Sequence, residues 1–127
     1  MVLVDSSLWI AVERGYVDFL DLVPPTEEIA ICPIVVLEVM RGTTPERHRK
    51  MLRLLLRATM LDSPTPLERF EAAVELFVRC RNEGITPSTP DSLIAACAIA
   101  HDVPLLHDDS DFDRIAAVTS LKLVTRS

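Results

Sequence analysis

The sequence has few cysteines, no long apolar run and no signal peptide. Cys32, Cys80 and Cys97 are an odd number without a CxxC pair, which argues against a disulfide framework or a zinc knuckle and favours buried thiols in a reducing cytosol. The longest apolar stretch, Leu93 to Ala100, is far below the roughly 20 residues that span a bilayer. The opening MVLVD has no basic segment typical of a signal peptide. We therefore expect a soluble, cytoplasmic protein that binds no membrane.

The chain also lacks an excess of positive charge. Its 13 Lys and Arg against 19 Asp and Glu give a net charge of −6, which argues against nonspecific nucleic-acid binding by overall charge. It contains no internal repeat or low-complexity tract. A length of 127 residues with 49% apolar residues is enough for one core, so we expect a single domain over residues 1–127.

Short apolar segments alternate with longer helical patterns along the chain. The predicted strands are Val2–Val4, Glu28–Cys32, Met60–Leu61, Pro104–Leu106 and Leu121–Val124. The predicted helices are Ser6–Val12, Pro33–Arg41, Thr44–Ala58, Leu67–Asn82, a helix that Thr89 caps and that runs to His101, and Ser110–Val118. This order predicts an α/β fold with a mainly parallel central sheet covered by helices on both faces.

Two acids directly follow predicted strands. Asp5 follows Val2–Val4, and Asp109 follows the strand that ends near His107. Parallel sheets place ligand sites at the carboxyl ends of their strands, so these two carboxylates are candidate site residues. Asp5 alone is also explained as the cap of the next helix, a common use of aspartate.

Glu38 is the only charged residue in the segment ICPIVVLEVM. A helix that is apolar nearly all round should be buried, and a buried carboxylate without a partner costs several kcal/mol. Glu38 therefore needs a cation. The alternative to a metal ion is an ion pair with Arg41 at i+3.

A third group of acids surrounds the last predicted helices. Asp91 lies in the first turn of an otherwise apolar helix, where the helix dipole alone would favour it. Asp108, Asp109, Asp111 and Asp113 then place four carboxylates close together, and such like charges repel unless a cation is present. Oxygen-only ligands favour Mg²⁺ or Mn²⁺. Two such ions about 4 Å apart support phosphodiester hydrolysis.

Basic residues concentrate in one segment. Six of the 13 lie between Arg41 and Arg57, where Glu46 is the only acid. On the predicted helix, Arg49, Arg53 and Arg57 recur at every fourth position, with Lys50 beside them. The stripe is either a solvated helix face or a track for RNA phosphates.

In the order of these acids and in the segments around them, the chain resembles PIN-domain ribonucleases, in particular VapC-type toxins of type II toxin–antitoxin (VapBC) systems. The resemblance rests on three segments that span nearly the whole chain: VLVDSSLWI, CPIVVLEVMRG and GITPSTPDSLIAACAIAHDVPLLHDDSDF. It implies a three-layer α/β/α sandwich. The family more often has Thr and then Asn or a basic residue where this chain has His107 and Asp108, which leaves open whether Asp108, Asp109 or Asp111 binds metal directly.

The resemblance also implies a function. Asp5, Glu38, Asp91 and Asp109 would be the catalytic, metal-binding acids, with Asp111 as a fifth ligand and Ser7 as the hydrogen-bond support of Asp5. The activity would be Mg²⁺-dependent cleavage of RNA by a metal-activated water, in a homodimer controlled by a VapB-type antitoxin. Two alternatives stay open: a catalytically weak PIN-like scaffold that binds proteins, and another Mg²⁺-dependent phosphoryl-transfer domain.

Overall fold

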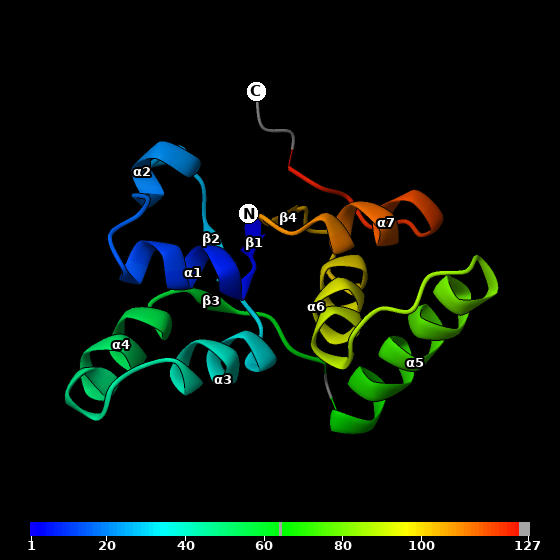
Figure 1. Ribbon diagram of the computed structural model, residues 1–127, viewed down its shortest axis with the longest axis horizontal. Helices are drawn as coiled ribbons and strands as arrows, with labels where there is room; N and C mark the ends of the chain where they lie inside the picture. Colours follow the sequence, from blue (N-terminus) through cyan, green and yellow to red (C-terminus); the bar gives the residue numbers. More distant parts are fainter. Residues whose placement is uncertain (64, 125–127) are drawn as a thin grey trace.

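A computed structural model describes residues 1–63 and 65–124 of the chain. Its centre is a parallel sheet of four short strands in the order β3-β2-β1-β4 (Figure 1). The strands are β1 (Val2–Val4), β2 (Ile29–Ile31), β3 (Thr59–Met60) and β4 (Leu105–Leu106). Leu3 pairs with Ala30 on one side and with Leu105 on the other. The predicted parallel sheet is confirmed.

The helices pack around this sheet. They are α1 (Ser6–Glu13), α2 (Phe19–Leu22), α3 (Pro33–Arg41), α4 (His48–Leu55), α5 (Pro66–Asn82), α6 (Thr89–Ala100) and α7 (Ser110–Val118), with a 3₁₀ helix η1 (Pro45–Arg47). In Figure 1, α1 to α4 gather on one side of the view and α5 to α7 on the other. Among the described residues, no helix is long and apolar enough to cross a membrane.

The central strands are buried because they are apolar at consecutive positions. Leu3, Val4, Ala30 and Ile31 have no exposed surface, as expected for a parallel sheet with helices on its faces. Directly after β1, the chain meets Asp5, whose backbone N–H donates to the carbonyl oxygen of Leu106 at 3.0 Å. The ends of β1 and β4 therefore lie side by side, and the acids that follow them enter the same region.

The predicted helix over Thr44–Ala58 is divided. The chain first forms η1 and then α4, which ends at Leu55, and Thr44 makes no capping hydrogen bond with its side chain. Arg47 of η1 instead forms an ion pair with Glu13 of α1 at 2.7 Å. This contact between distant segments holds the 3₁₀ turn against α1, which helical periodicity cannot reveal.

Two other local predictions need correction, and one element was missed. Ser88, not Thr89, caps α6, because its Oγ accepts the Asp91 N–H at 3.2 Å. Within the described residues, the predicted last strand pairs through a single parallel bridge between Leu105 and Leu123. The short helix α2 was not predicted.

Helix α5 presents two apolar stripes. The helical periodicity of the sequence runs through Phe70, Ala73, Val74 and Phe77, but Phe70 and Val74 are 52% and 59% exposed. The buried stripe consists of Ala73, Leu76 and Cys80. The exposed stripe consists of Leu67, Phe70, Val74 and Val78. A 3.6-residue period fits both stripes, and only packing against α6 selects between them.

Candidate metal centre

Asp5 is the buried centre of the acidic site. Its side chain is 4% exposed and it is the N-cap of α1. Oδ2 accepts hydrogen bonds from the Ser7 hydroxyl at 2.7 Å and from the Ser7 N–H at 3.4 Å. The Ser6 hydroxyl donates to Oδ1 at 3.4 Å. The capping role that we considered for Asp5 is therefore real, and Ser6 and Ser7 hold the carboxylate in place.

Asp91 faces this carboxylate from the first turn of α6. Burial, followed by the negative charges of Asp5 and Asp109, raises the pKa of Asp91 to about 6, although the Ser88 side chain lowers it. Such a shift means that the protein holds this carboxylate partly away from water and near other negative charges, with little compensation. A favourable helix dipole does not account for that environment.

Asp109 and Asp111 complete a tight group with Asp91. One carboxylate oxygen from each of the three lies within 4.8 Å of the others. Asp109 is the N-cap of α7 and accepts the Asp111 N–H at 2.9 Å. Because capping fixes the turn between β4 and α7, it also brings both carboxylates toward α6. Asp108 does not belong to this three-acid group within the described residues.

Glu38 approaches Asp5 from α3. Burial raises the pKa of Glu38 and the charge of Asp5 raises it further, whereas Ser6 and then Arg41 lower it. No ion pair joins Glu38 to Arg41 in the described part of the chain, and Glu38 Oε1 is buried without a hydrogen-bond partner there. The alternative explanation of Glu38, an ion pair with Arg41, is not supported by the structure.

The site residues fit a hard divalent cation. The donors are all carboxylate oxygens, the set that Mg²⁺ and Mn²⁺ prefer. Three of them, Asp91, Asp109 and Asp111, already share one site. A positive charge placed between the acids would give the buried Glu38 Oε1 a partner. It would also lower the raised pKa of Asp91.

The sequence profile of the PIN domain matches residues 2–118. Ribonuclease VapC11 of Mycobacterium tuberculosis is 32% identical to this chain, and the alignment covers 96% of each. The chain belongs to the PIN-domain family of VapC ribonucleases. Ribonuclease VapC21 of the same organism is also 32% identical, over 72% of this chain and 67% of the relative.

Solved structures share the fold of this PIN domain. VapBC2 from Rickettsia felis, bound to a DNA fragment from its promoter, matches with a TM-score of 0.77 and 23% identity, covering 98% of both chains. DNA-bound VapBC from Salmonella typhimurium matches with a TM-score of 0.78 and 16% identity, covering 97% of this chain and 96% of the other. At such low identity, these matches support the fold alone, and they agree with the predicted α/β sandwich.

Two neighbours of the acids were not predicted as site residues of the PIN domain. Arg114 forms an ion pair with Asp111 at i,i+3 on α7, and this spacing in the sequence could have indicated the contact. His107 accepts the Asp109 N–H through Nδ1 at 3.1 Å and packs against the Phe112 ring, with 5.4 Å between the ring centroids. Arg114 neutralises part of the charge at Asp111. His107 stabilises the turn that contains Asp109 through its hydrogen bond to the Asp109 N–H.

The predicted basic stripe lies at the other end of α1. Arg49, Lys50 and Arg53 are exposed on α4, and Arg57 follows that helix. Lys50, Arg53 and Arg57 line a groove of about 540 Å³ between α1 and α4, which Glu13 and Arg47 also line. Because α1 has eight residues, this groove lies roughly 12 Å along the helix from Asp5.

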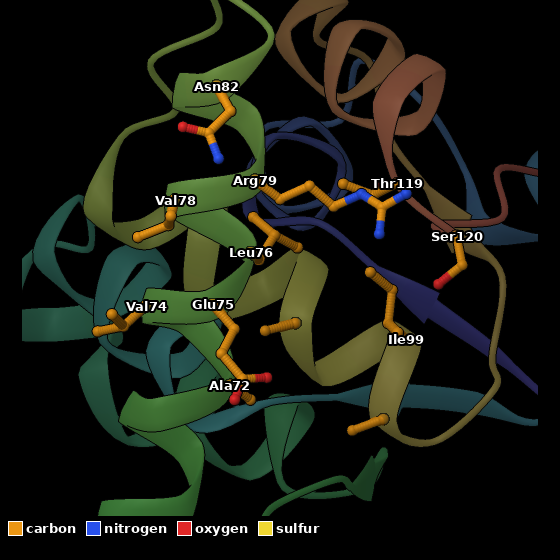
Figure 2. A pocket seen from close by; sticks show the side chains of 12 residues that line it. Ala72, Val74, Glu75, Leu76, Val78, Arg79, Asn82, Ile99, Thr119 and Ser120 are labelled. Atoms are coloured by element: carbon orange, nitrogen blue, oxygen red, sulfur yellow. The ribbon is translucent and has the colours of Figure 1, made fainter.

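A second hollow lies between α5, α6 and the segment after α7 (Figure 2). It measures about 630 Å³, and Glu75 is the only acid among its lining residues. The α6 residues in the lining are Ala96, Ile99 and Ala100, toward the end of the helix opposite Asp91. The hollow therefore adds nothing to the metal centre.

The raised pKa of Asp91 predicts how the metal-free protein responds to pH. Because its pKa is about 6 in the fold and 3.8 ordinarily, the folded state holds a proton longer than the unfolded chain. The Asp91 contribution to the free energy of unfolding therefore falls as pH rises from about 4 to about 6. Thermal melting in chelator should show the melting-temperature advantage of Asp91→Asn over wild type growing across this window. An advantage that does not change with pH would contradict the prediction.

Proposed function

We propose that this PIN domain is the toxin of a type II toxin–antitoxin pair and acts as a Mg²⁺-dependent endoribonuclease. The observation that carries the proposal is the meeting of Asp91, Asp109 and Asp111 within 4.8 Å, beside the buried Asp5. An all-carboxylate site of this kind suits phosphodiester hydrolysis. We infer that the whole of residues 1–127 forms this one domain.

Similarity to known proteins supports the substrate and the partner. The relatives at 32% identity are named ribonucleases, so we propose RNA as the substrate. The structural neighbours from Rickettsia felis and Salmonella typhimurium are VapBC complexes, so we propose a VapB-type antitoxin as the partner. The chemistry and the partner then follow from different observations and can be tested separately.

In the proposed mechanism, Asp5, Glu38, Asp91 and Asp109 hold Mg²⁺, and Asp111 assists. Mg²⁺ held by these residues would supply acidification of a water and neutralisation of negative charge on the phosphate. Ser7 fixes the Asp5 carboxylate through the 2.7 Å hydrogen bond, so that its oxygens need not reorganise when substrate arrives. No serine or cysteine nucleophile is required.

Removal of divalent metal tests this mechanism. RNA cleavage should fall by at least about 1000-fold in EDTA, because a metal ion contributes several kcal/mol to the transition state. Excess Mg²⁺ or Mn²⁺ should restore the activity. The products should carry no 2′,3′-cyclic phosphate, since water rather than the ribose hydroxyl attacks. Metal-independent cleavage would contradict the proposal, and calorimetry that shows no Mg²⁺ or Mn²⁺ binding would favour the scaffold alternative.

We further propose that Arg49, Lys50, Arg53 and Arg57 bind RNA phosphates. The groove that three of them line supports this role. Arg53→Glu should raise KM about tenfold with little change in kcat, because a lost phosphate contact weakens binding and not chemistry. Arg81→Glu, a charge reversal at an exposed residue of α5, is the matched control. Equal effects of the two variants would assign the change to overall charge.

We also propose that the domain forms a homodimer. The exposed stripe of α5, Leu67, Phe70, Val74 and Val78, supports this, because such apolar surface is stabilised by a partner. The stripe borders the hollow of Figure 2 through Val74 and Val78. Sedimentation should give a dimer for wild type and a monomer for Val74→Glu. A monomeric wild type would contradict the proposal.

A further inference from the structure

Two cysteines and a histidine lie together where α6 meets the junction of β2 and α3. Cys97, a half-buried residue of α6, places Sγ 3.6 Å from the Leu61 carbonyl oxygen and 3.8 Å from His101 Nδ1. Cys32, buried between β2 and α3, lines the same small pocket as Cys97 and Leu61. Residues far apart in the sequence thus bring two thiols together beside a pocket.

The pKa values of the two thiols are shifted in opposite directions. Their mutual hydrogen bond, helped by burial, raises the pKa of Cys32. The same bond lowers the pKa of Cys97, His101 lowers it further, and burial opposes both. His101 Nδ1 also lies 3.0 Å from the Cys97 carbonyl oxygen. A carbonyl can only accept, so Nδ1 carries a hydrogen and presents a donor close to Sγ.

The cost of ionising Cys97 is limited. Its S–H donates to the Leu61 carbonyl oxygen, and this bond is lost in the thiolate. The thiolate gains the Cys32 S–H as a donor, and the Nδ1–H of His101, which it shares with the Cys97 carbonyl oxygen, lies beside it with Nδ1 3.8 Å from Sγ. Cys97 is therefore the nucleophile of the pair, while Cys32 keeps its proton until it reacts.

We propose that Cys97 and Cys32 form a redox-reactive pair, in which a hydroperoxide oxidises Cys97 and Cys32 converts the product to an intramolecular disulfide. The Cys97 thiolate attacks one peroxide oxygen, the O–O bond breaks, and hydroxide or alkoxide leaves with the electron pair. The Cys32 sulfur then attacks the Cys97 sulfenic acid, the S–S bond forms, and water leaves with the Cys32 proton. The peroxide is reduced by two electrons, which the two thiols supply.

A metal ion does not explain this cluster. In the described ranges 1–63 and 65–124, only Asp91, Asp109 and Asp111 bring three candidate ligand atoms within 4.8 Å of one another. Cys32, Cys97 and His101 do not. Cys32 and Cys97 line one small pocket, and two neighbouring thiols are the groups that disulfide formation needs.

The disulfide would join the two helices that carry acids of the metal centre. Cys32 is the N-cap of α3, six residues before Glu38, and Cys97 lies six residues after Asp91. Bonded sulfurs are about 2.05 Å apart, much closer than two thiols in contact. The bond therefore draws the start of α3 toward α6 and fixes their relative position.

Thiol counting on the reduced, folded full chain tests the proposal without any activity assay. After limited hydrogen peroxide, wild type should fall from three free thiols to one, and peptide mapping should identify a Cys32–Cys97 disulfide. Dithiothreitol should restore all three thiols. Cys80→Ser is the control, because Cys80 is fully buried and burial raises its pKa; this variant should still form the same bond.

Two variants separate the roles of the thiols. Cys32→Ser should stop at a sulfenic acid on Cys97 that dimedone traps, whereas Cys97→Ser should form no disulfide. Retention of three thiols by folded wild type, or a bond that involves Cys80 or a second chain, would overturn the proposal. If Cys32→Ser does not fold, mapping of the wild-type disulfide still decides the matter.

Discussion

Asp91→Asn is expected to lower RNA cleavage by at least about 100-fold while leaving the fold intact, because removal of one preorganised charged group in an active site typically costs ~10²–10³. Asp91 shares a site with Asp109 and Asp111, and the amide that replaces it keeps the shape but loses the negative charge that a cation needs. The measurement is single-turnover cleavage of RNA at saturating Mg²⁺.

The same substitution should stabilise the metal-free protein near neutral pH. Burial and then neighbouring negative charges raise the pKa of the native carboxyl to about 6, so the neutral amide removes both the cost of burying a charge and a repulsion. Asp21→Asn, on the exposed face of α2, is the matched control and should retain full activity. Wild-type cleavage by Asp91→Asn would remove this residue from the proposed metal centre. Lost activity together with a lower melting temperature would indicate misfolding instead.

Phe112→Ala should have the largest effect on stability. The ring has no exposed surface and packs edge-on against His107, with 63° between the ring planes. Deletion of a buried phenyl ring costs about 3–5 kcal/mol, a large part of the roughly 5–15 kcal/mol that stabilises a typical domain. Urea denaturation monitored by circular dichroism should give this decrease in the free energy of unfolding.

The position of Phe112 connects its packing to the site. It lies next to Asp111 on α7, directly after the turn that Asp109 caps. Phe112→Leu should cost less than about 1.5 kcal/mol, because it largely fills the same space, and it should retain Mg²⁺ affinity. A loss of Mg²⁺ affinity in Phe112→Leu would mean that the aromatic contact with His107, and not core volume, holds the acids in place.

Much of the fold follows from local sequence. Val2–Val4 and Ser110–Val118 have the predicted bounds, and Pro33 and Gly42 mark the start and end of α3 as expected. These elements are predictable because an apolar run, a helix-starting proline or a capping residue acts within a few positions. The division at Arg47 was not predicted, because helical periodicity does not reveal contacts between distant segments, such as the ion pair of Arg47 with Glu13 of α1.

The candidate acids could also be proposed from the sequence, since Asp5 and Asp109 follow strands and Glu38 interrupts an apolar helix. The burial and hydrogen-bond partners of each acid were not predictable. Capping explains part of the placement of Asp5 and Asp109, but no local rule foresees that Glu38 Oε1 lacks a partner in the described structure. The contact of Arg114 with Asp111 could have been read from spacing, although spacing does not reveal that this pair borders the metal centre.

The sequence by itself determined the type of fold, the family and the identities of the candidate acids, because these depend on residue type, order and spacing. Only the tertiary structure decided which stripe of α5 is buried, which acids share one site, and that Cys32 and Cys97 meet. These properties depend on distances between segments far apart in the chain. Burial and neighbouring charge then act through space, as they do on the pKa values of Asp91 and Cys97.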